Sequence, residues 1–157
     1  MSNRNSSRTG LFLMELILAV LFFSLAGVVC IRLFVSSHTL SEKSVELNHG
    51  ILWAQNVAEA FYGCNGDGKE MADLFEGCHY GTFEDDTTFL DLFFDENFVP
   101  YPDGALTDFQ IKNDEYEYRL CTRIRTQEHG LLSCNIYLYK PTEKDYIYEL
   151  NLSLFPQ

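Results

Sequence analysis

A single carboxylate, Glu15, lies within residues 11–31, a stretch in which Ser24 is the one other polar side chain. A charged carboxylate at the centre of a lipid bilayer costs on the order of 2.5 to 3.5 kcal/mol, so a carboxylate in such a segment is interpreted as functional by default. The chemistry open to it is pairing with a cation, because pairing offsets the cost of placing either charge in lipid. Glu15 is therefore the first candidate functional residue.

The element that positions Glu15 is a predicted membrane-spanning helix. Residues 11–31 suffice to cross the hydrocarbon core, which needs about 20 apolar residues at roughly 1.5 Å each. A polar leader with Arg4 and Arg8 precedes them and ends at Gly10. Its positive charges favour the cytoplasmic side, so we expect the cytoplasmic (inner) membrane, with the N-terminus inside and the C-terminal domain outside. A cleaved secretory signal peptide has a shorter apolar core that ends at a small-residue site, which this run does not match.

A positive leader ends at Gly10, an apolar residue follows it, and Glu15 is the fifth residue of a continuous apolar helix. This pattern resembles the class III signal of type IV pilins and pseudopilins. In that family a membrane-embedded prepilin peptidase cuts after the glycine and methylates the new N-terminal amine. The resemblance implies cleavage between Gly10 and Leu11, with Leu11 as the methylated residue. It also implies that Glu15 is an assembly contact, which pairs with the amine of a neighbouring subunit. The membrane, the peptidase and other pilin or pseudopilin subunits are then the partners.

Two features depart from the family pattern. The residues between Gly10 and Glu15 are Leu, Phe, Leu and Met, whereas Phe, Thr, Leu and Ile are the most common ones, and the proline found in the membrane helix of many major pilins is missing. The alternative interpretation places Glu15 near the cytoplasmic interface of an ordinary signal anchor, where its side chain reaches water. The chain is then an unprocessed single-pass membrane-anchored protein with an acidic extracellular binding domain.

Beyond the membrane segment the chain is strongly acidic. Three of the 11 basic residues and one of the 23 acidic residues precede residue 37, so residues 37–157 carry eight basic and 22 acidic side chains and a net charge of −14. A surface of this charge repels nucleic acid and anionic lipid. We therefore expect no nucleic acid binding by the isolated domain.

The membrane helix is predicted to continue past the membrane segment. An apolar stripe at alternating steps of four and three follows it, formed by Leu40, Ser44, Leu47, Ile51, Ala54, Ala58 and Phe61. No proline interrupts residues 11–62, and Gly63 is the first strong stop. The result is one helix of about 50 residues, on the order of 75 Å long. The chain then divides into a leader peptide (1–10), the transmembrane half of the helix (11–36) and an extracytoplasmic domain (37–157).

From residue 115 the apolar residues recur with period two, which predicts three antiparallel strands over residues 115–125, 131–139 and 146–154. The apolar face is formed by Tyr116, Tyr118, Leu120 and Ile124 on the first strand and by Tyr146, Tyr148, Leu150, Leu152 and Leu154 on the last. Residues 64–114 carry the least pattern: 70–76 fit a short helix, and 85–95 fit a helix or a buried loop. The predicted fold class is α+β, a long N-terminal membrane-spanning helix whose C-terminal half packs on a small antiparallel β-sheet, a pilin-like arrangement.

Four cysteines outside the membrane segment are candidates for two disulfides in an exported domain. Cys64 and Cys78 flank a glycine-rich loop, and Cys121 and Cys134 lie on two consecutive predicted strands. The second pair depends on the turn register, because Cys121 lies on the side opposite to the apolar face of its strand, whereas Cys134 alternates in step with Ile136. Free thiols are the alternative for both pairs.

Nothing in the sequence indicates an active site, a cofactor or a metal. Cys64, Cys78 and His79 lack a clear fourth zinc ligand, and residues 65–70 lack the third acidic position and the distant glutamate of a calcium loop. Some pseudopilins bind calcium in loops beside the sheet, which makes the acidic residues of segment 84–95 a candidate, but a charge run of this type is usually a solvated face. We expect no enzyme but a structural subunit, a minor pilin or pseudopilin, whose apparatus serves adhesion, secretion, motility or DNA uptake.

Overall fold

The computed structural model describes residues 4–102, 104–106, 111 and 115–156. Its elements in chain order are α1 (Arg4–Gly63), α2 (Gly68–Ala72), β1 (His79–Thr82), β2 (Thr88–Phe94), β3 (Tyr118–Thr126), the 3-10 helix η1 (Glu128–Gly130), β4 (Leu132–Tyr139) and β5 (Tyr148–Leu154). Residues 1–3 of the predicted leader lie outside the described residues. Contacts divide the chain into two units, Met1–Ser44 and Val45–Gln157.

In Met1–Ser44 the described residues belong to a single element, α1. Large apolar residues from Leu11 to Val35 leave 46% to 79% of their surface exposed, on every side of the helix. In the described part of the chain, α1 is the one helix that is long and apolar enough to cross a membrane. A continuous apolar surface of this kind is suited to lipid rather than to water, so the segment favours association with a membrane.

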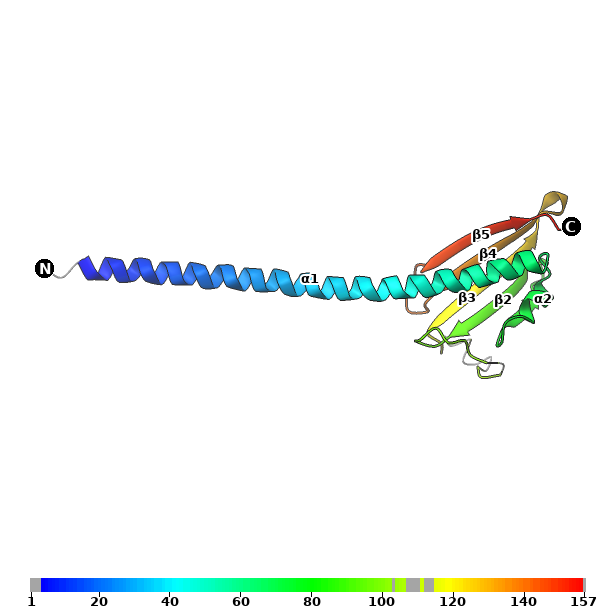
Figure 1. The fold of residues 1–157 in the computed structure, drawn as a ribbon, viewed down its shortest axis with the longest axis horizontal. Coiled ribbons are helices and arrows are strands. Elements are labelled where there is room, and N and C mark those ends of the chain that lie inside the picture. The colour runs from blue at the N-terminus through cyan, green and yellow to red at the C-terminus, as the bar shows by residue number, and fades with distance from the viewer. Residues whose placement is uncertain (1–3, 103, 107–110, 112–114, 157) are drawn as a thin grey trace. The chain divides into compact units, whose positions relative to one another are not determined.

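In Val45–Gln157 five antiparallel strands form one sheet in the order β1-β2-β3-β4-β5, so each strand pairs with its neighbours in the sequence (Figure 1). Residues 45–63 of α1 pack on one face of this sheet, here called the inner face. The observed architecture is a helix on an antiparallel sheet, which confirms the predicted α+β class. The helix predicted over residues 11–62 is also confirmed, as part of α1.

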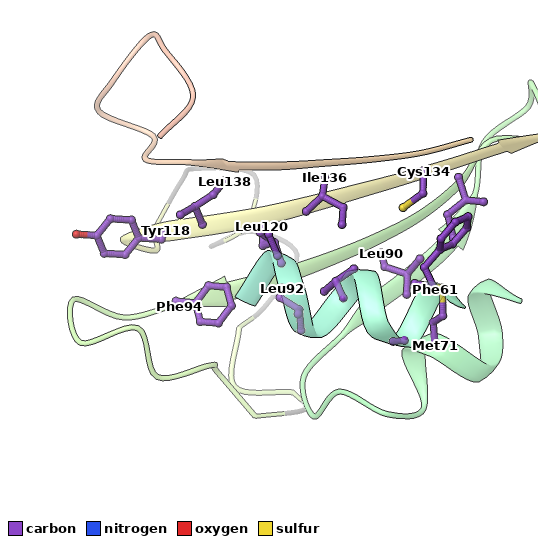
Figure 2. Packing of buried hydrophobic residues seen from close by; sticks show 14 of the residues in the cluster. Phe61, Met71, Leu90, Leu92, Phe94, Tyr118, Leu120, Cys134, Ile136 and Leu138 are labelled. Atoms are coloured by element: carbon purple, nitrogen blue, oxygen red, sulfur yellow. The ribbon is translucent and has the colours of Figure 1, made fainter. Parts of the chain in front are cut away.

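The core lies between α1 and the inner face (Figure 2). Phe61 of α1, Leu120 of β3 and Ile136 of β4 are all fully buried, and alternate residues of β2 meet them from the neighbouring strand. Met71 of α2 closes one end of the same core. Burial of an apolar side chain of this size contributes about 1.5 to 3 kcal/mol, so this face provides most of the packing that holds α1 on the sheet.

Gly50 sets how closely α1 approaches the sheet. A Cβ atom built at this position would lie 2.6 Å from Cδ2 of Leu138, a fully buried side chain. Contacts that short do not occur between carbon atoms without a shift of one of them. Glycine at position 50 therefore allows the helix backbone to lie directly against β4.

β1 and β2 were not predicted as strands. Residues 85–95 were expected to form a helix or a buried loop, but Thr88–Phe94 form a strand that pairs with β1 on one side and β3 on the other. Every residue from Leu90 to Phe94 is buried. Because both faces of β2 are covered, the apolar residues form a run without the period of two that marks a half-exposed strand.

Two tyrosines assigned to the inner face lie elsewhere. Tyr116 precedes β3 and packs with Phe93 and Leu106 in a second apolar cluster. Tyr146 precedes β5, and its ring lies 4.9 Å from the ring of Tyr137. Both predictions were wrong because the period of two was extended past the end of the strand, where the backbone turns.

The predicted short helix over residues 70–76 is displaced toward the N-terminus. α2 spans Gly68–Ala72, and Asp67 caps it by accepting hydrogen bonds from the backbone N–H groups of Lys69 and Glu70 at 2.9 and 3.1 Å. An aspartate is a preferred N-cap residue, so the cap fixes where this helix begins.

Candidate functional site

The three residues predicted for processing and assembly, Gly10, Leu11 and Glu15, all lie on α1. Leu11 and Glu15 are exposed and are four residues apart, which places them on the same side of the helix, one turn from each other. Apart from the neighbouring residues and backbone of α1 itself, no heavy atom lies within 4 Å of the position that a Cβ would take at Gly10. A larger side chain at residue 10 therefore meets no steric obstacle within the protein itself.

The candidate pair Cys121 and Cys134 does not form, because the two residues point to opposite faces of the sheet. Cys121 lies opposite Tyr137, whereas Cys134 lies opposite Ile124 and belongs to the inner face. Both thiols are free. Burial raises the pKa of each thiol to about 12, with Asp91 as a further cause at Cys121. Both groups are therefore protonated at neutral pH and unreactive.

The other candidate pair lies at the end of α1. Cys64 and Cys78 are both half-buried and pack against the main core. Burial raises the pKa of the Cys64 thiol, and the negative charges of Glu70 and Asp67 raise it further. A disulfide between Cys64 and Cys78 stays a prediction for the oxidised protein.

Two acidic residues of segment 84–95, Asp85 and Asp95, accept hydrogen bonds from backbone N–H groups in separate turns. Asp95 accepts hydrogen bonds from the backbone N–H groups of Asn97 and Val99 at 2.8 and 2.9 Å and so closes a turn. Hydrogen bonds from Thr87 lower the pKa of Asp85. Across the described residues, no three His, Cys, Asp or Glu side chains are grouped so that they could hold a metal ion.

The face of the sheet opposite α1, here called the outer face, carries a charged cluster that sequence reasoning missed. Asp91 of β2 lies between Arg119 and Arg123 of β3, and its side chain is only 5% exposed. Arg119 Nη2 donates to Asp91 Oδ2 at 2.6 Å, and Arg123 Nη1 donates to Oδ1 at 2.7 Å. A buried carboxylate needs such partners, because an unpaired one costs several kcal/mol.

Aromatic rings surround both guanidinium groups of this cluster. The Arg119 guanidinium lies 5.3 Å from the ring centre of Phe93, and Nη1 donates to the Tyr139 hydroxyl at 2.8 Å. The Arg123 guanidinium lies 5.5 Å from the ring centres of both Phe83 and Phe89. Cation–π contacts of this kind contribute about 0.5 to 2 kcal/mol, so the rings help to hold the two side chains in place.

A single feature of the sequence could have indicated this cluster. Asp91 is a charged residue in the middle of the apolar run Phe-Leu-Asp-Leu-Phe, at residues 89–93. A charge in such a position requires a partner from another strand. The sequence does not say which strand, because the pairing of Asp91 with Cys121 follows from a register that joins segments about 30 residues apart.

A second polar cluster ties α1 to the sheet where the helix first packs on it. The Tyr118 hydroxyl donates to Glu46 Oε1 at 2.8 Å. Lys140 Nζ lies 2.6 Å from Glu117 Oε1 and 3.9 Å from Glu46 Oε1. Burial and the hydrogen bond to Glu46 raise the pKa of Tyr118 to about 12, so the hydroxyl stays a donor at neutral pH.

Comparisons of the chain with protein-family models, with curated proteins and with solved structures found no match. The resemblance to type IV pilins therefore depends on Gly10, Leu11 and Glu15 and on a fold that is compatible with a pilin-like architecture.

Proposed function

We propose that the chain is a type IV pilin-like structural subunit, a minor pilin or pseudopilin. Prepilin peptidase cuts it between Gly10 and Leu11, and the mature subunit is assembled into a pilus or a type II secretion-like pseudopilus. The observation that carries this proposal is the place of Glu15: it lies on the exposed apolar part of α1, four residues after Leu11. The subunit is held in the cytoplasmic membrane with its N-terminus inside before assembly.

The physical case concerns the charge of Glu15 in lipid. An isolated carboxylate there is unfavourable by a few kcal/mol. Cleavage after Gly10 creates an amine at Leu11, and in a bundle of α1 helices the amine of one subunit neutralises Glu15 of its neighbour. The exposed apolar side chains of residues 11–35 provide the packing surface of such a bundle. Processing and assembly are then coupled by one ion pair.

The test of processing is an intact-mass and N-terminal peptide analysis of the protein from its native membrane, in cells with an active prepilin peptidase. We expect a chain that begins at N-methylated Leu11. Gly10→Lys should leave the leader attached, and Thr9→Lys is the matched control, because it adds the same charge to the leader and keeps the glycine. A wild-type chain that still begins at Met1 or Ser2 would favour the unprocessed single-pass protein with an acidic extracellular binding domain.

The test of assembly is Glu15→Ala. Filament incorporation should be strongly reduced, while the thermal unfolding of residues 45–157 is unchanged, because Glu15 is exposed and lies outside that unit. The control is Glu42→Ala, which removes another exposed carboxylate of α1 outside the apolar segment. Normal incorporation of Glu15→Ala would contradict the role of this residue in assembly.

A further inference from the structure

The outer face of the sheet concentrates one kind of cation. The arginines of residues 37–157 are Arg119, Arg123 and Arg125, and all three lie on β3. They lie opposite Tyr139, Asn135 and Ser133 of β4, on the same face as Asp91. Arginine, unlike lysine, binds carboxylates through two parallel hydrogen bonds and stacks on aromatic rings. In a segment with 22 acidic residues, this segregation distinguishes β3 from the other strands, and Glu149 of β5, opposite Tyr137, is an exposed carboxylate on the same face.

The charges of the cluster do not balance. Asp91 uses both carboxylate oxygens on Arg119 and Arg123, so one carboxylate serves two guanidinium groups and one positive charge is left over. Arg119 Nε is buried and has no hydrogen-bond partner among the described residues. The third arginine, Arg125, lies 3.8 Å from Asp85, and both side chains are more than 60% exposed. That pair is weak, as exposed ion pairs usually are.

The cluster reaches the surface. The side chains of Arg119 and Arg123 are 23% and 22% exposed, whereas Asp91 beneath them is buried. Exposed aromatic side chains lie on either side, with Phe83 next to Arg123 and Tyr146 next to Tyr139. Arginine and aromatic residues are enriched at protein interfaces and at the positions that dominate binding energy. The outer face has this composition.

We propose that the outer face binds an acidic segment of another protein, whose carboxylate groups are received by Arg119 and Arg123. The complementarity of charge is local: the left-over positive charge of the cluster meets the negative charge of the partner, and the flanking rings exclude water around the contact. This interaction is separate from the assembly of α1 helices and does not depend on it.

A different protein fits this face better than a second copy of the same chain does. Two copies with a net charge of −14 in residues 37–157 repel one another, whereas an acidic segment on a partner of lower net charge brings the same carboxylates with less repulsion. At physiological salt, charges separated by more than about 8 Å are largely screened. The direct contact between guanidinium and carboxylate groups persists under those conditions.

The test measures the fluorescence anisotropy of two labelled probe peptides, (Glu-Ala)4-Tyr and (Gln-Ala)4-Tyr, with the full chain in detergent at 150 mM salt. We expect the Glu peptide to bind about tenfold more tightly than the Gln peptide. The triple variant D91N/R119Q/R123Q, which replaces the three charged side chains of the cluster by neutral polar ones, should remove that difference. Arg125→Gln is the comparison variant on the same strand: it removes one positive charge of the outer face outside the Asp91 cluster, so it should lower the affinity for the Glu peptide less than the triple variant does.

A variant that gains affinity separates binding from misfolding. Asp91→Asn removes the competing charge and leaves both guanidinium groups for the probe, so the Glu peptide should bind several times more tightly. Loss of fold cannot produce that result. Equal binding of the two peptides by the wild-type chain, or no binding of the Glu peptide, would overturn the proposal. So would dimers in sedimentation that R119Q/R123Q disperses, because the outer face would then be a contact between copies.

Discussion

Two stretches of the same helix meet different surroundings. Between Leu11 and Val35, α1 carries large exposed apolar side chains on every side, and its polar residues are Glu15, Ser24 and Arg32. Between residues 45 and 63, apolar residues are confined to a stripe, and Ala54 and Phe61 in that stripe are fully buried against the sheet. The helix geometry is the same in both. The distribution of apolar residues around a helix therefore indicates what surrounds it, a membrane in the first stretch and a protein core in the second.

Variants in the two stretches of α1 test this difference, and we expect the largest loss of stability from Phe61→Ala. Phe61 is fully buried, and its truncation should lower the free energy of unfolding of residues 45–157 by about 3 to 5 kcal/mol, since a cavity is left in the core. The matched variant Phe22→Ala lies in the first stretch, where the side chain is 66% exposed. It should leave that free energy unchanged in chemical denaturation of the detergent-solubilised chain. Equal losses of unfolding free energy in the two variants would contradict the division of α1 into an exposed and a buried stretch.

The next largest effect is a loss of stability at high pH in residues 45–157, the unit in which α1 packs on the sheet. The thiols of Cys121 and Cys134 have pKa values raised from 9.0 to about 12. Between pH 9 and 12 the unfolded chain releases these protons and the folded chain keeps them, so stability is complete below pH 9 and falls as the pH rises toward 12. The loss should reach on the order of a few kcal/mol. Cys134→Ala should weaken the dependence measured by denaturation at each pH and leave the contribution of Cys121, whereas Cys30→Ala should not change it.

A smaller effect is expected from valine in place of the glycines of the two stretches. Gly50→Val brings a side chain into Leu138 and should destabilise residues 45–157 by about 1 to 3 kcal/mol through overpacking. Gly27→Val meets nothing within 4 Å and should leave the unfolding of that unit unchanged. Thermal unfolding of both variants provides the comparison. A stable Gly50→Val would mean that α1 does not lie directly against β4.

The smallest effect concerns the point at which α1 first packs on the sheet. Tyr118→Phe removes the hydrogen bond to Glu46 and should lower stability by about 0.5 to 1.5 kcal/mol. Hydrogen exchange should increase most in residues 46–53 of α1, because the contact holds that end of the packed stretch. Glu42→Gln, which removes the exposed pair with His38, should not change exchange there. Unchanged exchange in Tyr118→Phe would show that apolar packing alone fixes this end.

The long helix and the last three strands could be predicted from the sequence, because their apolar residues recur with a period that only one backbone geometry satisfies. β2 could not be predicted, because both of its faces are buried and its apolar residues therefore do not recur with a period of two. The side of the sheet that Cys121 faces was predicted correctly from its own strand, but the failure of its pairing with Cys134 needed the turn register. The Asp91 cluster was missed for the same reason, since β2 and β3 are joined by a register that no local pattern encodes.

The strand order β1-β2-β3-β4-β5 has a consequence for folding. Each pairing joins strands that are neighbours in the sequence, so little chain entropy is lost in closing most of the loops. The pairs β3–β4 and β4–β5 are therefore expected to form rapidly. The contacts of α1 with β4 and β5 join residues far apart in the sequence and close the largest loops. Residues 45–63 are thus synthesised before the sheet but are expected to gain their native contacts after it, and until then their apolar stripe remains open to chaperones or to aggregation.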